Sequence, residues 1–115
     1  MKITIFEDII AWQKARILTG KVYKTFVSCK DYSFKDQIQR ASLSVMNNVA
    51  EGFERKTNKE LKNFLFIAKG SCGEVRSMLY IAKERNYISN QEFEEYSKDA
   101  VEISKLLSGF IKSIE

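Results

Sequence analysis

The chain has 115 residues, of which 44% are hydrophobic and 30% charged; this suffices for one ordinary hydrophobic core, so we expect a single domain over residues 1–115. Its net charge of +4 permits binding to a polyanion without requiring it. Histidine is absent, which excludes Ser-His-Asp and Cys-His catalytic arrangements and the Glu-x-x-His motifs of di-iron helical bundles.

Proline is also absent and only five glycines are present, a composition typical of long helices joined by short loops. The first helix is predicted to begin near Glu7 and Asp8, whose carboxylates suit a helix N-terminus. Segment 2–6 alternates with period two, and we expect an ordered arm there rather than part of a sheet. The apolar residues of the helix recur at steps of three and four: Ala11, Ala15, Leu18, Val22 and Phe26.

The second helix follows a polar turn at residues 28–32. Ser33 followed by Asp36 resembles a capping box, and the helix is predicted to end near Arg55. Its apolar stripe is Phe34, Ile38, Ala41, Val45, Val49 and Phe53.

The last two helices have clearer starts. Thr57 followed by Glu60, and Ser89 followed by Glu92, are full capping-box patterns. Their apolar stripes are Leu61, Phe64, Ala68, Cys72, Val75, Leu79 and Ala82, and then Phe93, Tyr96, Ala100, Ile103, Leu107 and Phe110 or Ile114. Four amphipathic segments separated by short breaks predict an all-α fold, an antiparallel up-down-up-down four-helix bundle.

Charge is distributed unevenly along the chain. Residues 56–86 carry seven basic against three acidic side chains, and residues 87–115 carry three basic against six acidic. We therefore expect an electrically two-sided domain.

The two cysteines fit no metal spacing and, with no histidine present, a zinc site is nearly excluded. We expect Cys72 in the core and Cys29 in a more exposed loop, both as free thiols. The N-terminal residues lack the apolar stretch of a signal peptide, and no apolar run approaches the ~20 residues of a membrane span. The expected location is the cytoplasm, without membrane contact.

No segment carries a recognisable catalytic constellation. Segment 70–73 is glycine-rich but lacks the lysine and the preceding strand of a phosphate-binding loop. Glu51, Glu54 and Glu74 are interpreted as solvated helix faces. We predict a protein that is not an enzyme and that uses no metal, cofactor or small-molecule substrate.

Several residues are poor choices for an ordinary surface helix. Glycine costs about 1 kcal/mol against alanine in a helix interior, and serine and asparagine are middling helix formers. In the second helix, these residues indicate either an interface or a buried polar network, or else exposed positions with a frayed helix end at Gly52. In segment 70–73, they indicate close packing either against another helix of the same bundle or against another subunit. Trp12 is either a core residue or an interface anchor. The candidate residues are Trp12, Asn47, Asn48, Glu51, Gly52, Gly70, Ser71 and Glu74.

Several segments in order resemble a known family. They are residues 6–15 (FEDIIAWQKA), 37–41 (QIQRA), 48–52 (NVAEG) with Arg55, 67–71 (IAKGS) with Glu74, and 86–88 (NYI). The chain is similar to the four-helix bundle proteins encoded in intervening sequences of bacterial 23S rRNA genes. It departs from that pattern at Gln39, where the family usually has a second arginine, and at Cys72, where it tends to have leucine.

The resemblance implies a helical bundle that assembles into a ring-shaped homopentamer. A related accessory protein of diversity-generating retroelements is similar in shape and binds nucleic acid. The loss of a cation at position 39 weakens any grip on phosphate there, and the fold expectation is unaffected.

Two functions are compatible with these features. The first is a homo-oligomeric RNA- or DNA-binding protein whose basic side chains hold phosphates. Its candidate contacts are Lys14, Lys21, Lys24, Arg40, Arg55, Lys56, Lys59, Lys62, Lys69 and Arg76. The alternative is a structural scaffold that recruits a protein partner, with an acidic fourth helix facing the first or third helix of the next subunit.

Overall fold

The computed structural model describes residues 2–114, and all regular structure within them is helical. A short 3-10 turn, η1 (Phe6–Asp8), precedes four α-helices. They are α1 (Ile10–Thr25), α2 (Tyr32–Phe53), α3 (Asn58–Glu84) and α4 (Asn90–Ser113). The prediction of an all-α four-helix fold is confirmed, and segment 2–6 contains no strand.

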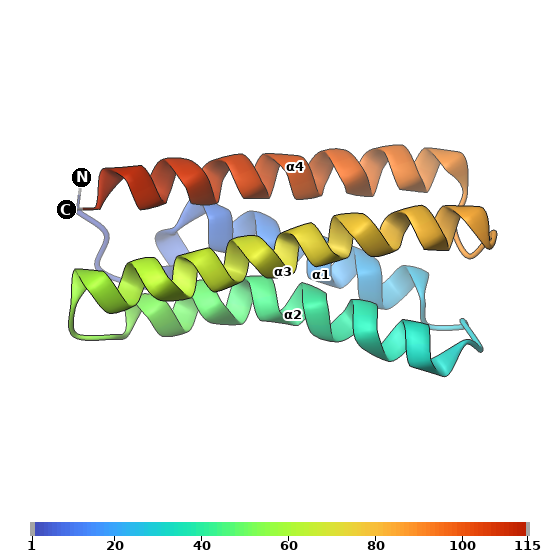
Figure 1. Cartoon of the computed structure of the whole chain (residues 1–115), viewed down its shortest axis with the longest axis horizontal. Coiled ribbons are helices and arrows are strands. Elements are labelled where there is room, and N and C mark those ends of the chain that lie inside the picture. Colours follow the sequence, from blue (N-terminus) through green and yellow to red (C-terminus); the bar gives the residue numbers. More distant parts are fainter. Residues whose placement is uncertain (1, 115) are drawn as a thin grey trace.

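The helices lie side by side along the long axis of a molecule that measures 43 × 22 × 19 Å. Each helix contacts two neighbours, in the pairs α1–α2, α2–α3, α3–α4 and α1–α4. Figure 1 shows the α1–α2 and α3–α4 loops at one end, and the α2–α3 loop with both termini at the other. Consecutive helices therefore run in opposite directions.

The start of α1 differs from the prediction. Glu7 and Asp8 lie in η1, and the helix begins only at Ile10 because Ile9 has extended backbone (φ −76°, ψ 120°). The apolar side chains decide this boundary. Ile9 is buried, and the ring of Phe6 packs edge-on against Trp12 with centroids 5.2 Å apart.

The start of α2 was also predicted wrongly. Ser33 and Asp36 do not form a capping box; Asp31 caps the helix, its side chain accepting a hydrogen bond from the Phe34 amide at 3.2 Å. Asp36 instead forms an ion pair with Arg40 at 2.9 Å, one turn further along the helix. An aspartate is too short to reach back to the backbone as the glutamate of a capping box does.

The caps of α3 and α4 differ from each other. Ser89 and Glu92 form the complete reciprocal capping box. Thr57 accepts from the Glu60 amide at 3.1 Å, whereas the Glu60 carboxylate takes the Thr57 hydroxyl and the Arg55 guanidinium. The full box predicted at Thr57 is therefore only half formed, because a nearby cation competes for its glutamate.

The hydrophobic core follows the predicted stripes except at the start of α3, where Leu65 is fully buried and the predicted Leu61 and Phe64 are half-buried. Its largest fully buried apolar side chains come from α2, α3 and α4 and from the residue just after α1: Phe26, Ile38, Leu65, Leu79, Ile103 and Leu107. Cys72 is buried and Cys29 is half-buried, as the sequence indicated. Trp12 is only half-buried, at the edge of the core.

Candidate nucleic-acid interface

The first group of candidate cations lies on α1 and is already paired within the chain. Lys21 Nζ lies 2.8 Å from both Glu95 Oε2 and Asp99 Oδ2 on α4. Lys14 forms a longer pair of 3.7 Å with Glu102. The acidic edge of α4 is therefore neutralised by α1 of the same chain rather than left for the next subunit.

Lys21 is held as a cation by these contacts. Its hydrogen bond to Asp99, followed in importance by the one to Glu95, raises the pKa of the lysine well above its ordinary value, against the opposing effect of burial. A lysine that already has two carboxylate partners is a poor donor to an external phosphate. We therefore assign Lys21 to the contact between α1 and α4.

The two candidate arginines of α2 and the following loop are paired as well. Arg40 Nε contacts Asp36, and Arg55 contacts Glu51 at 3.7 Å and Glu60 at 3.4 Å. The Arg55 guanidinium also lies over the Phe64 ring, 5.0 Å from its centroid. The ion pairs on this surface remain exposed to solvent, so each arginine keeps donors for a further contact.

The remaining candidate cations have no ion pair within residues 2–114. They are Lys24 on α1, Lys56 and Lys59 around the α2–α3 loop, and Lys62, Lys69 and Arg76 on α3. The last three are spaced by seven residues and so lie on one side of α3, about 10.5 Å apart along the helix axis. Lys62 and Lys69 are half-buried, and a half-buried lysine usually covers apolar surface with its aliphatic stem and keeps its ammonium group in solvent.

Sequence reasoning missed the cations of α4. Lys98, Lys105 and Lys112 are exposed and also repeat every seven residues. They were overlooked because residues 87–115 are acidic when counted as a segment. The helix keeps its paired carboxylates on the edge that faces α1 and carries these lysines on another side, so the net charge of the segment hides them.

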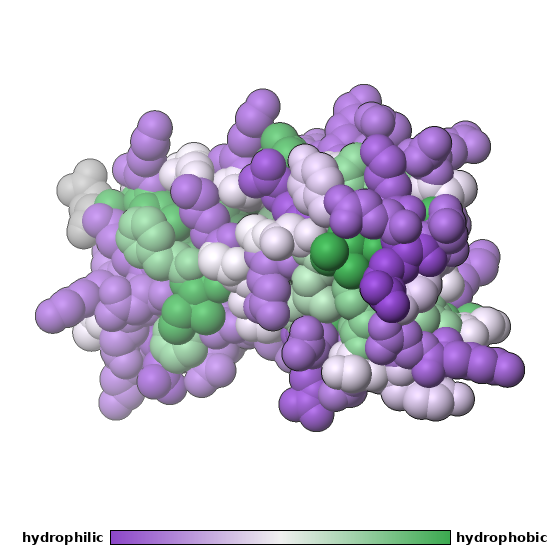
Figure 2. Space-filling model, turned by 45° about the vertical axis from the view of Figure 1, so that its right-hand side comes forward, coloured by the Kyte–Doolittle hydropathy of each residue, from purple (hydrophilic) through white to green (hydrophobic). Residues whose placement is uncertain are grey.

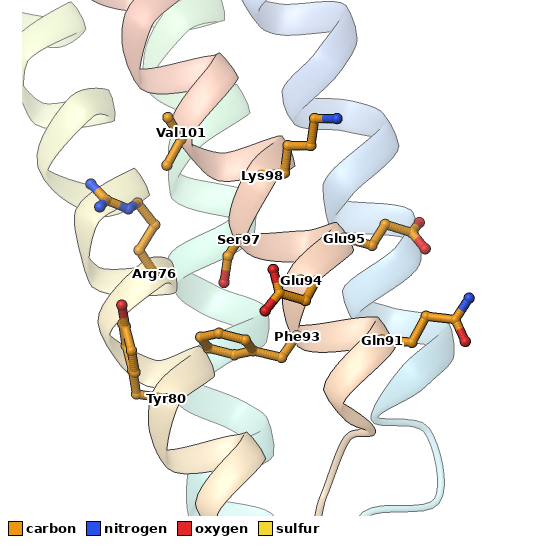
Figure 3. A pocket seen from close by; sticks show the side chains of 9 residues that line it. All are labelled: Arg76, Tyr80, Gln91, Phe93, Glu94, Glu95, Ser97, Lys98 and Val101. Carbon is orange, nitrogen blue, oxygen red and sulfur yellow. The ribbon is translucent and has the colours of Figure 1, made fainter.

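A shallow hollow of about 780 Å³ lies where α3 meets α4. Figure 3 shows Arg76 and Tyr80 on one helix facing Phe93, Glu94 and Ser97 on the other. The Ser97 hydroxyl is buried and has no hydrogen-bond partner within residues 2–114. The hollow is open and lacks the enclosure that a small-molecule site requires.

Part of the predicted polar network lies between α2 and α3. Asn48 donates to the carbonyl and the hydroxyl of Ser44 at 2.8 and 2.9 Å, and Ser44 shares a 2.8 Å hydrogen bond with Ser71. The network therefore joins two helices of the same chain. Asn47, Glu51 and Glu74 are exposed outside it.

The glycines on α2 and α3 have different surroundings. A Cβ added at Gly52 would lie 2.7 Å from the Phe64 Cβ, so this glycine allows α2 and α3 to approach closely; it is buried within the helix and is not a frayed end. A Cβ added at Gly70 or Gly73 would meet nothing within 4 Å. Packing inside the chain therefore explains Gly52 but neither glycine of α3.

The buried thiol of Cys72 lies in the core and is shielded from solvent. Burial raises the pKa of the Cys72 thiol to about 11, and the thiol donates to the Ala100 carbonyl at 3.1 Å. Within residues 2–114 no three Cys, Asp or Glu side chains gather as metal ligands would. None of the helices over the same residues has the length and apolarity to cross a membrane.

The fold and its surface define a small helical-bundle protein that carries one row of cations without ion pairs along α3 and another along α4 within residues 2–114. The chain belongs to the 23S rRNA-intervening sequence protein family, whose model matches residues 7–109. It is similar to a protein of unknown function from the S23 ribosomal protein family of Bacteroides thetaiotaomicron, known from a crystal structure at 1.70 Å resolution. The two are 26% identical with a TM-score of 0.84 over 90% of this chain and 96% of the other. No curated protein matches the chain.

Proposed function

We propose that the protein is a non-enzymatic, cytoplasmic, homo-oligomeric nucleic-acid-binding protein that holds RNA or DNA through its basic surface. The observation that carries the proposal is the separation of its cations into two sets. Lys14 and Lys21 of α1 are paired with α4, whereas Lys56 of the α2–α3 loop and Lys59, Lys62, Lys69 and Arg76 of α3 have no ion pair within residues 2–114. Unpaired lysines and arginines in a row match the electrostatics of a phosphate backbone.

Binding to labelled RNA and DNA across a range of salt concentrations tests the proposal. We expect an affinity that falls steeply with salt and depends little on sequence, because phosphate contacts release counterions and do not read bases. Negligible affinity for both nucleic acids at ~50 mM salt, where phosphate contacts count most, would contradict it.

The proposed self-association has its own support on α3. Ile67, Gly70, Glu74, Ser77 and Ile81 are all exposed and follow each other at steps of three and four. Such a seam faces one direction on a helix, and its two small residues allow another helix to approach closely. Ile67 and Ile81 are 52% and 44% exposed, an apolar surface that a second subunit would cover.

The ring of five subunits implied by the family resemblance is the specific form we propose. Light scattering at micromolar concentration should give a mass five times the 13.3 kDa of the chain. Replacing Ile67 and Ile81 by serine should lower that mass, whereas Ile17→Ser on α1, which is 57% exposed but lies outside the seam, should not. A monomeric mass for the wild type would contradict the ring.

The alternative is a scaffold that recruits a protein and has no nucleic-acid role. The exposed apolar side chains favour this scaffold alternative. Figure 2 shows them in separate areas of the surface, surrounded by hydrophilic residues. A defined oligomeric mass combined with no affinity for RNA or DNA would support it.

A further inference from the structure

Two rows of side chains run next to each other along α3. The basic row is Lys62, Lys69 and Arg76. The second row, offset by four residues from the first, is Phe66, Gly73 and Tyr80. Both rows advance by seven residues per step, so each spans about 21 Å from its first to its last member.

The aromatic side chains of the second row are unusually exposed. Phe66 is 56% and Tyr80 57% accessible. Tyr80 packs edge-on against Phe93 with centroids 5.0 Å apart, an arrangement that fixes the ring from one side. Between the two aromatics lies Gly73, where even a Cβ would meet nothing within 4 Å. The row therefore presents two ring surfaces with a clear space between them.

The edge of α4 that borders the basic row includes the small side chains of Ser97, Val101 and Ser104. Cys72 on α3 contacts Ala100, and Arg76 lines one hollow with Ser97 and Val101, which sets the antiparallel register of the two helices. In that register Lys69 lies opposite Ser104, and Lys62 lies opposite the last turns of α4. Ser97 and Ser104 are half-buried and leave the cations of α3 accessible from that side.

The basic row has a defined end at Arg76. Lys83, one step beyond Arg76, lies with its Nζ 4.5 Å from the centroid of the Phe93 ring. Glu94 lines the hollow beside Arg76 (Figure 3), and its negative charge disfavours a phosphate beyond that point. The basic row is therefore limited to its three cations.

We propose that single-stranded nucleic acid lies along α3, with its phosphates on Lys62, Lys69 and Arg76 and unpaired bases stacked on Phe66 and Tyr80. This inference rests on the proposed nucleic-acid function and assigns its site. A positively charged track beside aromatic platforms is the arrangement by which proteins hold single strands without reading sequence. A strand with stacked bases, which advances about 3.4 Å per nucleotide, would place roughly six nucleotides over the rows, and a more extended strand would place fewer.

A single strand fits these rows better than a duplex does. Bases in a duplex are paired and stacked inside it, so their faces cannot reach rings on a helix surface. An acidic peptide could contact the cations, but its carboxylate side chains would leave Phe66 and Tyr80 uncovered. Exposed rings next to cations therefore favour unpaired bases.

The test measures fluorescence anisotropy of a labelled, unstructured 12-nucleotide RNA, and of the same sequence as a duplex, with the full chain. One variant replaces Lys62, Lys69 and Arg76 by glutamine. The matched control replaces Lys98, Lys105 and Lys112 by glutamine, which removes the same charge from the neighbouring helix. In Figure 3 the side chain of Lys98 points away from Arg76.

We expect the α3 variant to lower the dependence of log affinity on log salt by about 2, since each phosphate contact to a single strand contributes about 0.7. The α4 control should leave that slope nearly unchanged. Tyr80→Ala should weaken single-strand binding about fivefold or more, and Tyr80→Phe should restore it, because stacking needs the ring and not the hydroxyl. The duplex should bind more weakly than the single strand.

Several results would overturn the assignment while leaving nucleic-acid binding intact. They are equal losses from the α3 and α4 variants, duplex binding as tight as single-strand binding, or no effect of Tyr80→Ala in a variant that melts normally. Equally tight binding of a polyglutamate peptide of matched length would assign the row to an acidic protein partner instead. No binding of any nucleic acid by the wild type at ~50 mM salt would remove the proposed function itself.

Discussion

Cys29 and Cys72 are chemically different because of where the fold places them. Cys72 is buried, and desolvation raises the pKa of its thiol to about 11, so only about a thousandth of it is thiolate near pH 8. Cys29 is half-buried between α1 and α2. We expect a thiol reagent to modify one cysteine per folded chain quickly, and both in denaturant. Mass spectrometry of the modified peptides should identify Cys29; fast modification of Cys72 in the folded chain would show that α3 and α4 open readily.

Asp31 makes the stability of the α1–α2 loop depend on pH. The Tyr87 hydroxyl donates to Asp31 Oδ2 at 2.5 Å and accepts from Arg85 Nε at 3.2 Å. The bond from Tyr87, followed by the one from the Phe34 amide, lowers the pKa of Asp31 below its ordinary 3.8. A lowered carboxyl pKa stabilises the fold above pH 3.8, and this contribution disappears as the pH falls through the pKa of the folded state.

Removing the tyrosine hydroxyl tests that contact. Tyr87→Phe keeps the ring packed on Phe34 and should lower the melting temperature at pH 7. The difference from the wild type should shrink as the pH falls below 3.8, because Asp31 then becomes protonated in both chains. A difference that stays constant down to pH 2 would show that the ring, and not the carboxylate bond, is responsible.

At the scale of the helices, the glycines of α2 and α3 should respond in opposite ways to the same substitution. Gly52→Ala forces a contact of 2.7 Å with Phe64, and separating the helices should cost about 1–3 kcal/mol, partly offset by the better helix propensity of alanine. Gly73→Ala adds a methyl group in open space and should stabilise the chain by up to about 1 kcal/mol. Urea unfolding measures both. Equal effects of the two variants would contradict the close approach of α2 and α3.

At the scale of the whole molecule, ion pairs join the first helix to the last. Lys21→Met leaves Glu95 and Asp99 as unpaired carboxylates one turn apart on α4. Because these groups are partly exposed, we expect the free energy of unfolding to fall by about 1 kcal/mol or less. The decrease should be smaller at high salt. Lys24→Met, which breaks no ion pair, is the control. Thermal melts at low and high salt should separate the two variants; a loss independent of salt would point to packing of the lysine stem instead.

The sequence by itself determined most of the helical framework. Helix positions and the apolar stripes depend on interactions within a few residues, such as the cap at Ser89 and the three-and-four spacing of Ala68, Cys72 and Val75. Where those local signals were ambiguous, as at Asp8 and Ser33, the boundary was predicted wrongly. There the packing of Ile9 and the cap by Asp31 decided the outcome.

Only the tertiary structure decided which candidate residues remain available to a partner. Lys21 and Lys69 look alike in sequence, but Lys21 meets Asp99, 78 positions further along the chain, whereas Lys69 meets no carboxylate within residues 2–114. Gly52 and Gly70 are both helical glycines, and only Gly52 faces another helix. Pairings between distant helices depend on how the helices pack and on the rotation of each about its axis, and a short window of sequence contains neither.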